Sequence, residues 1–269
     1  MLGAVASPEE GMMQSTSRGY RIHYTATGDS EHPALLLVHG ILQSGTRWAE
    51  MGYLDAFADT HRVIAIDLLG HGDSEKPTDP DAYTVDGQLQ DLLAVLDAEE
   101  APECHVWGYS GGAALALALA ASHPERTLST IVGGIPPNLP QDAREAVFGP
   151  WIDALQDGDW DRFWAAFLPV DEPTKALLQA SNDHRSVAAW MSGAAATADV
   201  VAPGDVPTLV YMGDEELFLD DARQTAGNIG ARFEIIPGRG HSGAFQDLAA
   251  VEPIVRSFLE HIPRTTPAR

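Results

Sequence analysis

The chain has 269 residues and a formal charge of −23, from 16 basic and 39 acidic side chains, which opposes binding to nucleic-acid phosphates or to an anionic membrane surface. Its single cysteine, Cys104, excludes an intrachain disulfide and a cysteine-based zinc cluster. Because no apolar run is long enough to cross a bilayer and the N-terminus lacks a secretory signal, we expect a cytoplasmic protein whose partner is a small-molecule substrate.

Short apolar runs alternate with longer helix-compatible stretches along most of the chain. After a pair of short strands around residues 15–26, strands are predicted at 34–38, 63–66, 104–107, 128–132, 208–212 and 232–236. Helical spacing of apolar residues falls at 48–58, 85–96, 112–122, 220–229 and 245–261. This alternation predicts an α/β fold with a mostly parallel sheet and helices on both faces.

Residues 135–205 interrupt the alternation, because they contain no convincing strand and are bordered by proline-containing turns. We predict a core formed by residues 1–134 and 206–269 and a helical cap formed by residues 135–205. The segment holds four of the six tryptophans, Trp151, Trp160, Trp164 and Trp190. These rings can form a small core of the segment, or line an apolar substrate pocket, or do both.

The sequence Gly108-Tyr109-Ser110-Gly111-Gly112 lies between a predicted strand and a predicted helix. A sharp strand-to-helix turn holds a serine hydroxyl out of the backbone, and glycines on both sides permit the strained conformation and the close approach that such a turn needs. Ser110 is therefore the candidate nucleophile. Tyr109, its neighbour, is a candidate pocket residue.

A serine nucleophile needs a base and a carboxylate that orients the base. Among the ten histidines, His241 fits best, because it lies in a glycine-rich loop after the last predicted strand, where catalytic groups gather in α/β sheets. Three adjacent acids, Asp214, Glu215 and Glu216, follow the strand predicted at 208–212. Any of the three is a candidate for the orienting carboxylate.

In this order, the motifs resemble the α/β-hydrolase family from about Tyr20 to about Ile262. The resemblance rests on the turn at 108–112, on residues 39–44 (HGILQS) and on residues 67–74 (DLLGHGDS). It implies an eight-stranded α/β-hydrolase sheet with a helical cap and the order nucleophile, acid, histidine. The family's spacing assigns the acid to Glu216, where most relatives carry aspartate, with Asp214 and Glu215 as substitutes.

The resemblance also assigns the donors that stabilise negative charge on a carbonyl oxygen. These are the backbone amides of Gly111 and Ile41, with Leu42 as the less favoured second donor. His39 is expected to hold its loop in place, and His71 either faces the pocket or is exposed. No metal or cofactor site is predicted, because the histidines lack the close pairs of His-Glu-X-X-His sites and Gly70-His71-Gly72 lacks the remaining residues of a nucleotide loop.

The predicted activity is hydrolysis of a small or medium, mainly apolar carboxylic ester, or of a lactone or thioester, through an acyl-enzyme. The alternatives are carbon–carbon lysis or acyl transfer by the same triad, and a small-ligand receptor or pseudoenzyme. Epoxide hydrolases and haloalkane dehalogenases resemble this architecture but use aspartate where this chain has Ser110, so neither activity is expected. The natural substrate, the mobility of the cap and the oligomeric state stay open.

Overall fold

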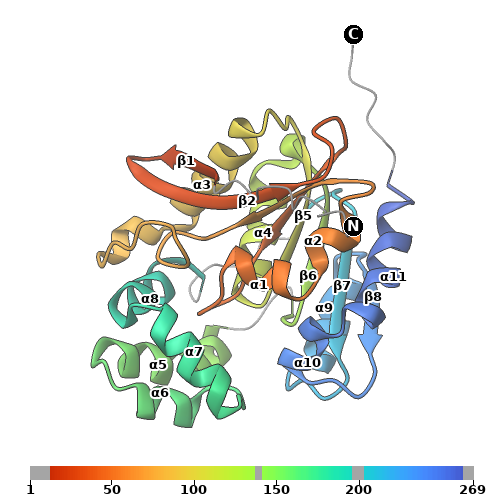
Figure 1. Cartoon of the computed structure of the whole chain (residues 1–269). Helices are drawn as coiled ribbons and strands as arrows, with labels where there is room; N and C mark the ends of the chain where they lie inside the picture. Colours follow the sequence, from red (N-terminus) through yellow and green to blue (C-terminus); the bar gives the residue numbers. More distant parts are fainter. Residues whose placement is uncertain (1–12, 137–140, 196–202, 263–269) are drawn as a thin grey trace, which may run out of the picture.

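The computed structural model describes residues 13–136, 141–195 and 203–262. Within them, eight strands form one sheet in the order β1-β2-β4-β3-β5-β6-β7-β8 (Figure 1). The strands are β1 (Met13–Ser17), β2 (Tyr20–Thr27), β3 (Ala34–Val38), β4 (Arg62–Ile66), β5 (Cys104–Tyr109), β6 (Thr127–Gly133), β7 (Thr208–Gly213) and β8 (Arg232–Ile236). Only the pairings of β1 with β2 and of β2 with β4 are antiparallel. The predicted eight-stranded, mostly parallel sheet is confirmed.

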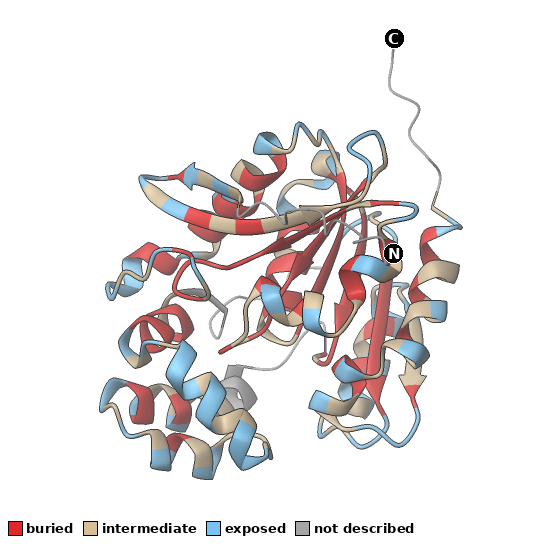
Figure 2. Cartoon of the chain, viewed as in Figure 1, coloured by how far each residue is buried: buried red, intermediate tan, exposed pale blue. Residues whose placement is uncertain are grey.

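Two apolar layers cover the sheet, because successive side chains of a strand point to opposite faces. On β3, Leu36 and Val38 join one buried cluster and Leu35 and Leu37 join the other. The first cluster includes side chains from α3 (Val85–Ala98) and α4 (Gly111–Ser122), and the second includes α1 (Gly45–Glu50), α2 (Tyr53–Phe57) and α11 (Leu248–Leu259). Figure 2 shows the buried strands between these helices. Helices therefore lie on both faces, as predicted.

Two predicted helices are interrupted in the structure. The stretch at 48–58 is divided between α1 and α2, because Gly52 adopts a φ of 83° that ends the first helix. The stretch at 245–261 is divided between α10 (His241–Gln246) and α11, because the Asp247 side chain accepts a hydrogen bond from Ala250 N and caps the second helix. The remaining core helix is α9 (Leu219–Asn228). None of the described helices has the length and apolar character needed to span a membrane.

Between β6 and β7, the described residues form helices and no strand. They are α5 (Gln141–Gln156), α6 (Trp160–Ala166), α7 (Glu172–Ser181), α8 (His184–Trp190) and a π-helical turn at Met191–Ala195. We call α5 to α8 the helical segment; Figure 1 shows them gathered beside one end of the sheet. The predicted cap boundaries border residues 137–140 and 196–202, which lie outside the described residues, so the division into core and cap stays a prediction.

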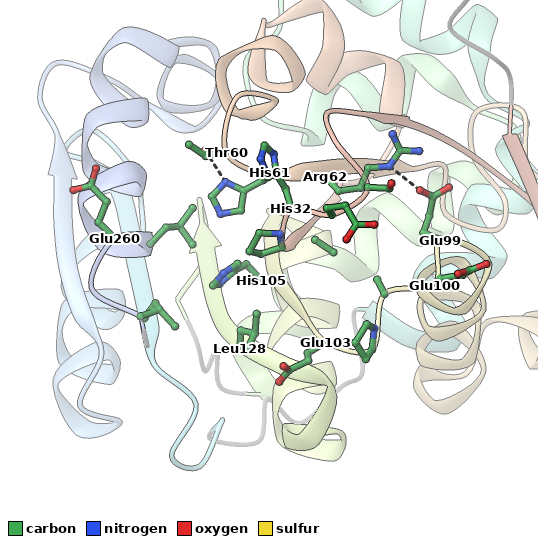
Figure 3. Close-up of a pocket in the computed structure, with 18 of the residues that line it drawn as sticks. His32, Thr60, His61, Arg62, Glu99, Glu100, Glu103, His105, Leu128 and Glu260 are labelled. Atoms are coloured by element: carbon green, nitrogen blue, oxygen red, sulfur yellow. Dashed lines mark hydrogen bonds and ion pairs between the residues drawn. The ribbon is translucent and has the colours of Figure 1, made fainter. Parts of the chain in front are cut away.

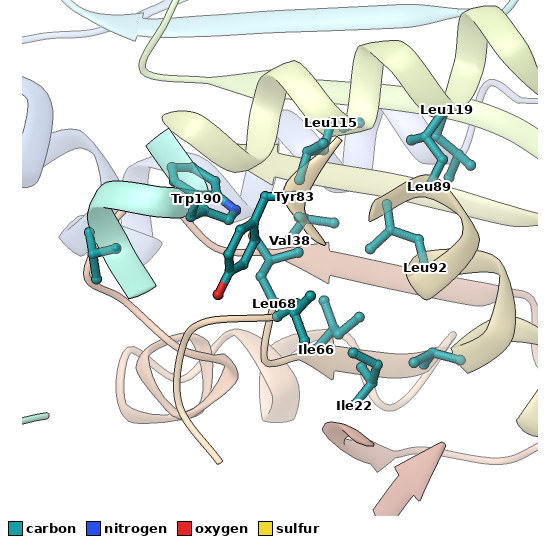
Figure 4. Packing of buried hydrophobic residues seen from close by; sticks show 14 of the residues in the cluster. Ile22, Val38, Ile66, Leu68, Tyr83, Leu89, Leu92, Leu115, Leu119 and Trp190 are labelled. Carbon is teal, nitrogen blue, oxygen red and sulfur yellow. The ribbon is translucent and has the colours of Figure 1, made fainter. Parts of the chain in front are cut away.

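One tryptophan joins the helical segment to the core. Trp190 is 2% exposed and belongs to the same apolar cluster as Tyr83 and Val38 (Figure 4). Its indole Nε1 donates a 2.7 Å hydrogen bond to Oε1 of Gln88 on α3. A satisfied indole N–H in a buried contact fixes the ring orientation, so the end of α8 is held in a defined place against the sheet.

Candidate active site

Ser110 lies at the turn between β5 and α4. Its backbone has φ 54° and ψ −125°, a strained conformation for a residue with a side chain. The turn is held by a 2.8 Å hydrogen bond from Ser110 N to Gly133 O on the neighbouring strand. The side chain is partly accessible and lines two cavities, as expected for an exposed nucleophile elbow.

The glycines around this turn leave no room for a side chain. A Cβ on Gly108 would lie 2.3 Å from Gly112 O, and one on Gly112 would lie 2.3 Å from Val38 O. A Cβ on Gly40, in the loop after β3, would lie 2.9 Å from Cβ of Ser110. Each contact is shorter than atoms tolerate. The glycines therefore set how closely α4 and the loop after β3 approach Ser110.

His241 begins α10 and lies beside one of the three candidate acids. Its Nδ1 is 2.9 Å from Oε2 of Glu216, while Oε1 of Glu216 accepts a 2.9 Å hydrogen bond from Gly213 N. The Glu216 side chain is 4% exposed and the His241 side chain 21%. Because Nδ1 faces the carboxylate, Nε2 is the ring nitrogen left for a substrate or nucleophile.

The other two acids have different surroundings. Oδ1 of Asp214 accepts hydrogen bonds from Gly238 N, at 2.7 Å, and Arg239 N, at 3.2 Å. Asp214 therefore braces the loop that carries His241. Glu215 is exposed, and its backbone amide donates to Arg239 O. Of the three adjacent acids, Glu216 is the one hydrogen-bonded to the imidazole.

The side chain of Tyr109 supports the backbone of His241. Its hydroxyl donates a 2.5 Å hydrogen bond to the backbone oxygen of His241, and the two rings lie 5.3 Å apart. Burial, with the nearby Glu216 carboxylate adding to it, raises the pKa of Tyr109 well above its ordinary value. The phenol therefore stays protonated and acts as a hydrogen-bond donor to the loop.

Two backbone amides near Ser110 have no acceptor among the described residues. Gly111 is the first residue of α4, so its N–H cannot bond within the helix. Ile41 N makes no backbone or side-chain hydrogen bond in the described chain. Both residues line the same cavity as Ser110. The Ser110 hydroxyl likewise has no hydrogen-bond partner within these residue ranges.

Two cavities meet at Ser110 and His241. The wide cavity has a volume of about 650 Å³, and the narrow cavity has about 220 Å³. Trp151 and Trp190 line the wide cavity, and Tyr109 lines the narrow one. Pockets of several hundred cubic ångströms with apolar walls and a few polar groups are typical of small-molecule sites.

Trp160 and Trp164 do not line the pocket at Ser110, which is one of the two roles predicted for them. Neither lines the wide or the narrow cavity. Their rings stack 5.8 Å apart and contact Phe163 at 5.6 and 4.9 Å. Phe163 is fully buried in α6, so these tryptophans pack around it and form the interior of the helical segment.

Several residues of the cavities had no sequence signal. Phe218 lines the wide cavity beside the acid loop, and Gln43, Arg47 and Gln246 line the narrow one. Gln43 lies in the 39–44 motif but had no role assigned to it, and the other three residues lie outside the motifs. Arg47 lies in α1 and Gln246 lies in α10, and both are short helices. These two residues could have been identified only by knowing that both helices begin beside Ser110.

His39 and His71 are both buried, and His39 also lines the narrow cavity. His39 Nδ1 lies 2.8 Å from Gly40 O, and its Nε2 accepts a 3.0 Å hydrogen bond from Leu68 N. His71 is fully buried, with its ring edge-on to Trp190 at 5.2 Å. Burial lowers the pKa of both imidazoles. His71 is neither exposed nor part of a cavity wall, in contrast to both expectations for it.

The described residues contain one group of side chains whose possible metal-ligand atoms are close enough to bind one ion. Ligand atoms of His23, Asp67 and Asp73 lie within 4.8 Å of one another. The Asp67 carboxylate already accepts hydrogen bonds from Gly45 N and Asp73 N and faces His23 Nδ1. A metal ion there would compete with the backbone N–H groups that already bond to the Asp67 carboxylate. These hydrogen bonds favour a structural role for the group over metal binding.

A third cavity of about 940 Å³ lies at the opposite end of the strands (Figure 3). It is lined by residues where β3, β4 and β5 begin, including Ala34, Arg62 and His105, whereas Ser110 follows the end of β5. His105 is 5% exposed and its Nδ1 lies 2.8 Å from Ser129 Oγ. Burial, with the neighbouring His61, lowers the pKa of His105 to about 3. This cavity is separate from the candidate site.

Comparisons with known proteins show what this chain is similar to. Mouse Epoxide hydrolase 4 is 32% identical over 118 residues, which cover 44% of this chain and only 32% of the mouse protein. Epoxide hydrolase 3 of Xenopus tropicalis is 25% identical over 297 residues, covering 96% of this chain and 80% of that protein. Among solved structures, the enol-lactonase from Burkholderia xenovorans LB400 matches with a TM-score of 0.80 at 22% identity, covering 93% of this chain and all of that one.

The family comparison covers the part of the chain that carries the nucleophile turn. The model of the alpha/beta hydrolase fold matches residues 33–170, just over half of the chain. This range includes both loops with free amides, the Ser110 turn and most of the helical segment. The TM-score of 0.80 shows that the chain shares the fold of the enol-lactonase. The protein belongs to the alpha/beta hydrolase fold family.

Proposed function

We propose that this protein is a serine hydrolase that cleaves a carboxylic ester, lactone or thioester through an acyl-enzyme. The observation that carries the proposal is the arrangement at the ends of β5 and β7. Ser110 occupies a strained, accessible turn, and His241, which lies on the same cavity walls, has its Nδ1 2.9 Å from Glu216. Nucleophile, base and orienting carboxylate are the three parts that such catalysis requires.

In the proposed first step, Ser110 Oγ attacks the carbonyl carbon of the substrate and passes its proton to Nε2 of His241. Glu216 keeps the imidazole in the tautomer with hydrogen on Nδ1 and favours the protonated ring that forms. The bond from the carbonyl carbon to the leaving oxygen or sulfur then breaks, and His241 returns the proton to that atom. Substrate binding has to bring Ser110 Oγ and Nε2 into contact, a tightening that is common when free enzymes bind substrate.

The negative charge on the carbonyl oxygen needs hydrogen-bond donors that are already in place. The Ile41 and Gly111 amides are proposed for this role, because both are free and border the cavity that contains Ser110. Losing one such donor raises a barrier by about 2.7 to 4 kcal/mol in other enzymes. In the second half-reaction, water activated by His241 attacks the acyl carbon, and Ser110 is released with its proton.

The residue at the nucleophile turn favours acyl chemistry over epoxide opening. Relatives named as epoxide hydrolases match this chain, but the family's epoxide hydrolases use aspartate where Ser110 stands here. A serine alkoxide attacks carbonyl carbon and gives an ester that water can hydrolyse, which is the chemistry that free amides beside Ser110 would assist. The likeness to a named enol-lactonase is compatible with an ester or lactone substrate.

The test compares hydrolysis of a short-chain nitrophenyl ester by the parent, by Ser110→Ala and by Ser122→Ala. Ser122 is an exposed serine at the other end of α4, so its replacement controls for changing a serine on the same helix. We expect Ser110→Ala to lose nearly all turnover and Ser122→Ala to retain it. Undiminished turnover by Ser110→Ala would exclude the mechanism.

A second assay separates hydrolysis from acyl transfer and carbon–carbon lysis, which the same triad can support. Products are analysed with and without an added alcohol or amine, and with a substrate whose scissile bond joins two carbons. Free acid as the main product supports the hydrolase. A dominant transfer product, or cleavage of the carbon–carbon bond alone, favours one of the alternatives.

A further inference from the structure

We propose that the substrate is two-sided, with a bulky apolar group in the wide cavity and a short oxygen-bearing group, best a carboxylate, in the narrow cavity. Arg47 and Gln43 would select the short group. This inference rests on the proposed ester hydrolysis at Ser110 and goes beyond it by naming the class of ester. It follows from the contrast between the walls of the two cavities.

The two cavities share the residues of the reaction centre. Ser110, His241 and Ile41 line both of them. Phe167 and Leu168, which follow α6, also border both. A carbonyl held at Ser110 therefore has one substituent directed toward each cavity. Because the volumes are about 650 and 220 Å³, the two substituents must differ in size.

Most side chains on the wall of the wide cavity are apolar, and its polar side chains are those of Ser110, Glu215, Glu216, His241 and Ser242. The two indole N–H groups on this wall are bonded elsewhere, since Trp151 Nε1 donates to Ala166 O at 2.9 Å and Trp190 Nε1 donates to Gln88 at 2.7 Å. A side chain on Gly111 would meet the Trp190 ring at 2.7 Å, so this ring lies directly against the nucleophile turn. An apolar substituent buried against these two rings therefore leaves neither indole N–H without a partner.

The narrow cavity instead offers hydrogen-bond donors. A guanidinium has five N–H groups, and that of Arg47 has one recorded partner, Glu50 Oε2 at 3.0 Å. The side-chain amides of Gln43 and Gln246 make no hydrogen bond to other described residues. The one carboxylate on this wall, Asp171, has both oxygens bonded to Thr174. The unengaged groups are thus mainly donors, which suit a ligand group with acceptor oxygens.

A carboxylate fits these donors better than a hydroxyl. A planar guanidinium binds both oxygens of a carboxylate, and a hydrogen bond to a charged group is stronger than one between neutral groups. The chain's charge of −23 opposes an anionic ligand, but charges farther than about 10 Å are largely screened at ordinary salt. Contact with Arg47 therefore decides the preference within the narrow cavity.

The experiment measures kcat/KM for matched esters of 3-phenylpropanoic acid in which the alcohol part is glycolic acid, ethylene glycol or 1-propanol. A mirrored series of 2-phenylethyl esters, in which the acid part is malonic, glycolic or butanoic acid, covers the opposite orientation at Ser110. Each series keeps one bulky apolar side and changes only the short side from carboxylate to hydroxyl to alkyl. The variants are Arg47→Met and Gln43→Leu. The control is Glu50→Gln, which removes the negative charge beside Arg47 and keeps both the guanidinium and an acceptor oxygen.

In whichever of the two ester series the parent hydrolyses, we expect it to prefer the carboxylate ester over the alkyl ester by about tenfold to a hundredfold. This is the range for a hydrogen bond to a charged group. Arg47→Met should lose this preference, because its kcat/KM should fall much more on the carboxylate ester than on the alkyl ester. Gln43→Leu should reduce the preference for the hydroxyl ester. Glu50→Gln should keep the parental order.

Two results overturn the inference and differ from failure of the proposed function. Equal rates of the parent on all three short groups, or faster cleavage of the alkyl ester, contradict the two-sided substrate while ester hydrolysis stands. Equal losses by Arg47→Met on the carboxylate and alkyl esters contradict the role of Arg47. Absence of turnover on every ester by the parent would instead contradict the serine hydrolase itself.

Discussion

The ends of the central strands and the helical segment differ in how firmly they are packed. Every residue of β3, β5 and β7 is buried, and the loops that follow these strands carry Ile41, Ser110 and Glu216. In the helical segment, α7 has no buried residue and α6 has only Phe163. Close packing transmits position, so the groups at the strand ends have little freedom, whereas α7, whose Thr174 and Leu178 line the narrow cavity, has no buried side chain to fix it.

The difference indicates how chemistry and selectivity are divided in this molecule. The strand ends hold the groups proposed to make and break bonds, and the helical segment supplies most of the apolar wall of the wide cavity. Within the segment, α8 is held more firmly, because Ser186 to Trp190 are buried and Trp190 is hydrogen-bonded to Gln88 of the core. Changes at strand ends should therefore affect catalysis or folding, and changes in the helical segment should affect the choice of substrate.

The largest expected effect concerns Glu216. Glu216→Gln places an amide beside His241 Nδ1 and removes the charge that orients the ring, so we expect kcat for a simple ester to fall about 10⁴-fold, as when the corresponding carboxylate is replaced in other serine hydrolases. Asp214→Asn is the control, because it keeps the oxygen that accepts from Gly238 and Arg239. A loss of the same size from Asp214→Asn or Glu215→Gln, with Glu216→Gln active, would reassign the acid.

A smaller but still severe effect is expected at the nucleophile turn. Gly112→Ala places a Cβ 2.3 Å from the backbone oxygen of Val38, which cannot move without disturbing β3. We expect the free energy of unfolding to fall by about 3 kcal/mol, at the upper end for overpacking, as measured by urea denaturation. Gly227→Ala in α9 meets nothing within 4 Å and should raise it by about 0.5 to 1 kcal/mol. Equal behaviour of the two variants would contradict the close packing at the turn.

The helical segment offers an intermediate test. Trp151 lines the wide cavity and Trp160 does not. We expect Trp151→Leu to lower kcat/KM for an ester with a bulky apolar side by about tenfold relative to an acetate ester, a typical effect of losing apolar contact in a pocket. Trp160→Leu should leave this ratio unchanged even if it lowers stability. A change in the ratio for Trp160→Leu alone would show that the wide cavity is not the apolar subsite.

The smallest effect is expected at the far end of the sheet. His105 has a pKa lowered to about 3 in the folded chain, whereas an exposed histidine titrates near 6.5. Above pH 6.5, His105 is neutral in both the folded and the unfolded chain. Between pH 6.5 and 3, only the unfolded chain takes up a proton at this residue, so the free energy of unfolding falls as the pH falls. His105→Asn should therefore reduce the slope of unfolding free energy against pH by up to about 1.4 kcal/mol per unit. Identical slopes from pH 6.5 to 5 for parent and variant would contradict burial of a neutral His105.

The sequence predicts the sheet well because each central strand is a short apolar run between turn residues, such as 34–38 and 104–107. The positions of strand ends also place Ser110, His241 and the three acids Asp214, Glu215 and Glu216 at the same end of a parallel sheet, and the resemblance to the family selects Glu216 among the acids. The structure brings His241 and Glu216 into hydrogen-bond contact. These predictions succeed because they depend on local patterns and on a rule that relates strand ends to one another.

The remaining features depend on contacts between segments far apart in the chain. The periodicity of 48–58 and 245–261 does not show that Gly52 and Asp247 interrupt the helices. Trp151 and Trp160 lie in similar surroundings in the sequence and both rings pack near Phe163, yet only Trp151 lines the wide cavity. Arg47 lies outside every motif that was identified in the sequence. Tertiary packing determines helix direction, and a single sequence carries little information about it.

The measurement that tests the central claim most directly is the site of covalent capture. The parent is treated with a fluorophosphonate, and the mass of the intact chain and of its peptides is determined. The account predicts one adduct per chain, on the peptide that contains Ser110, with no adduct in Ser110→Ala and much slower labelling in His241→Gln. Ester turnover by a parent that forms its adduct at another residue, or forms none, would contradict it.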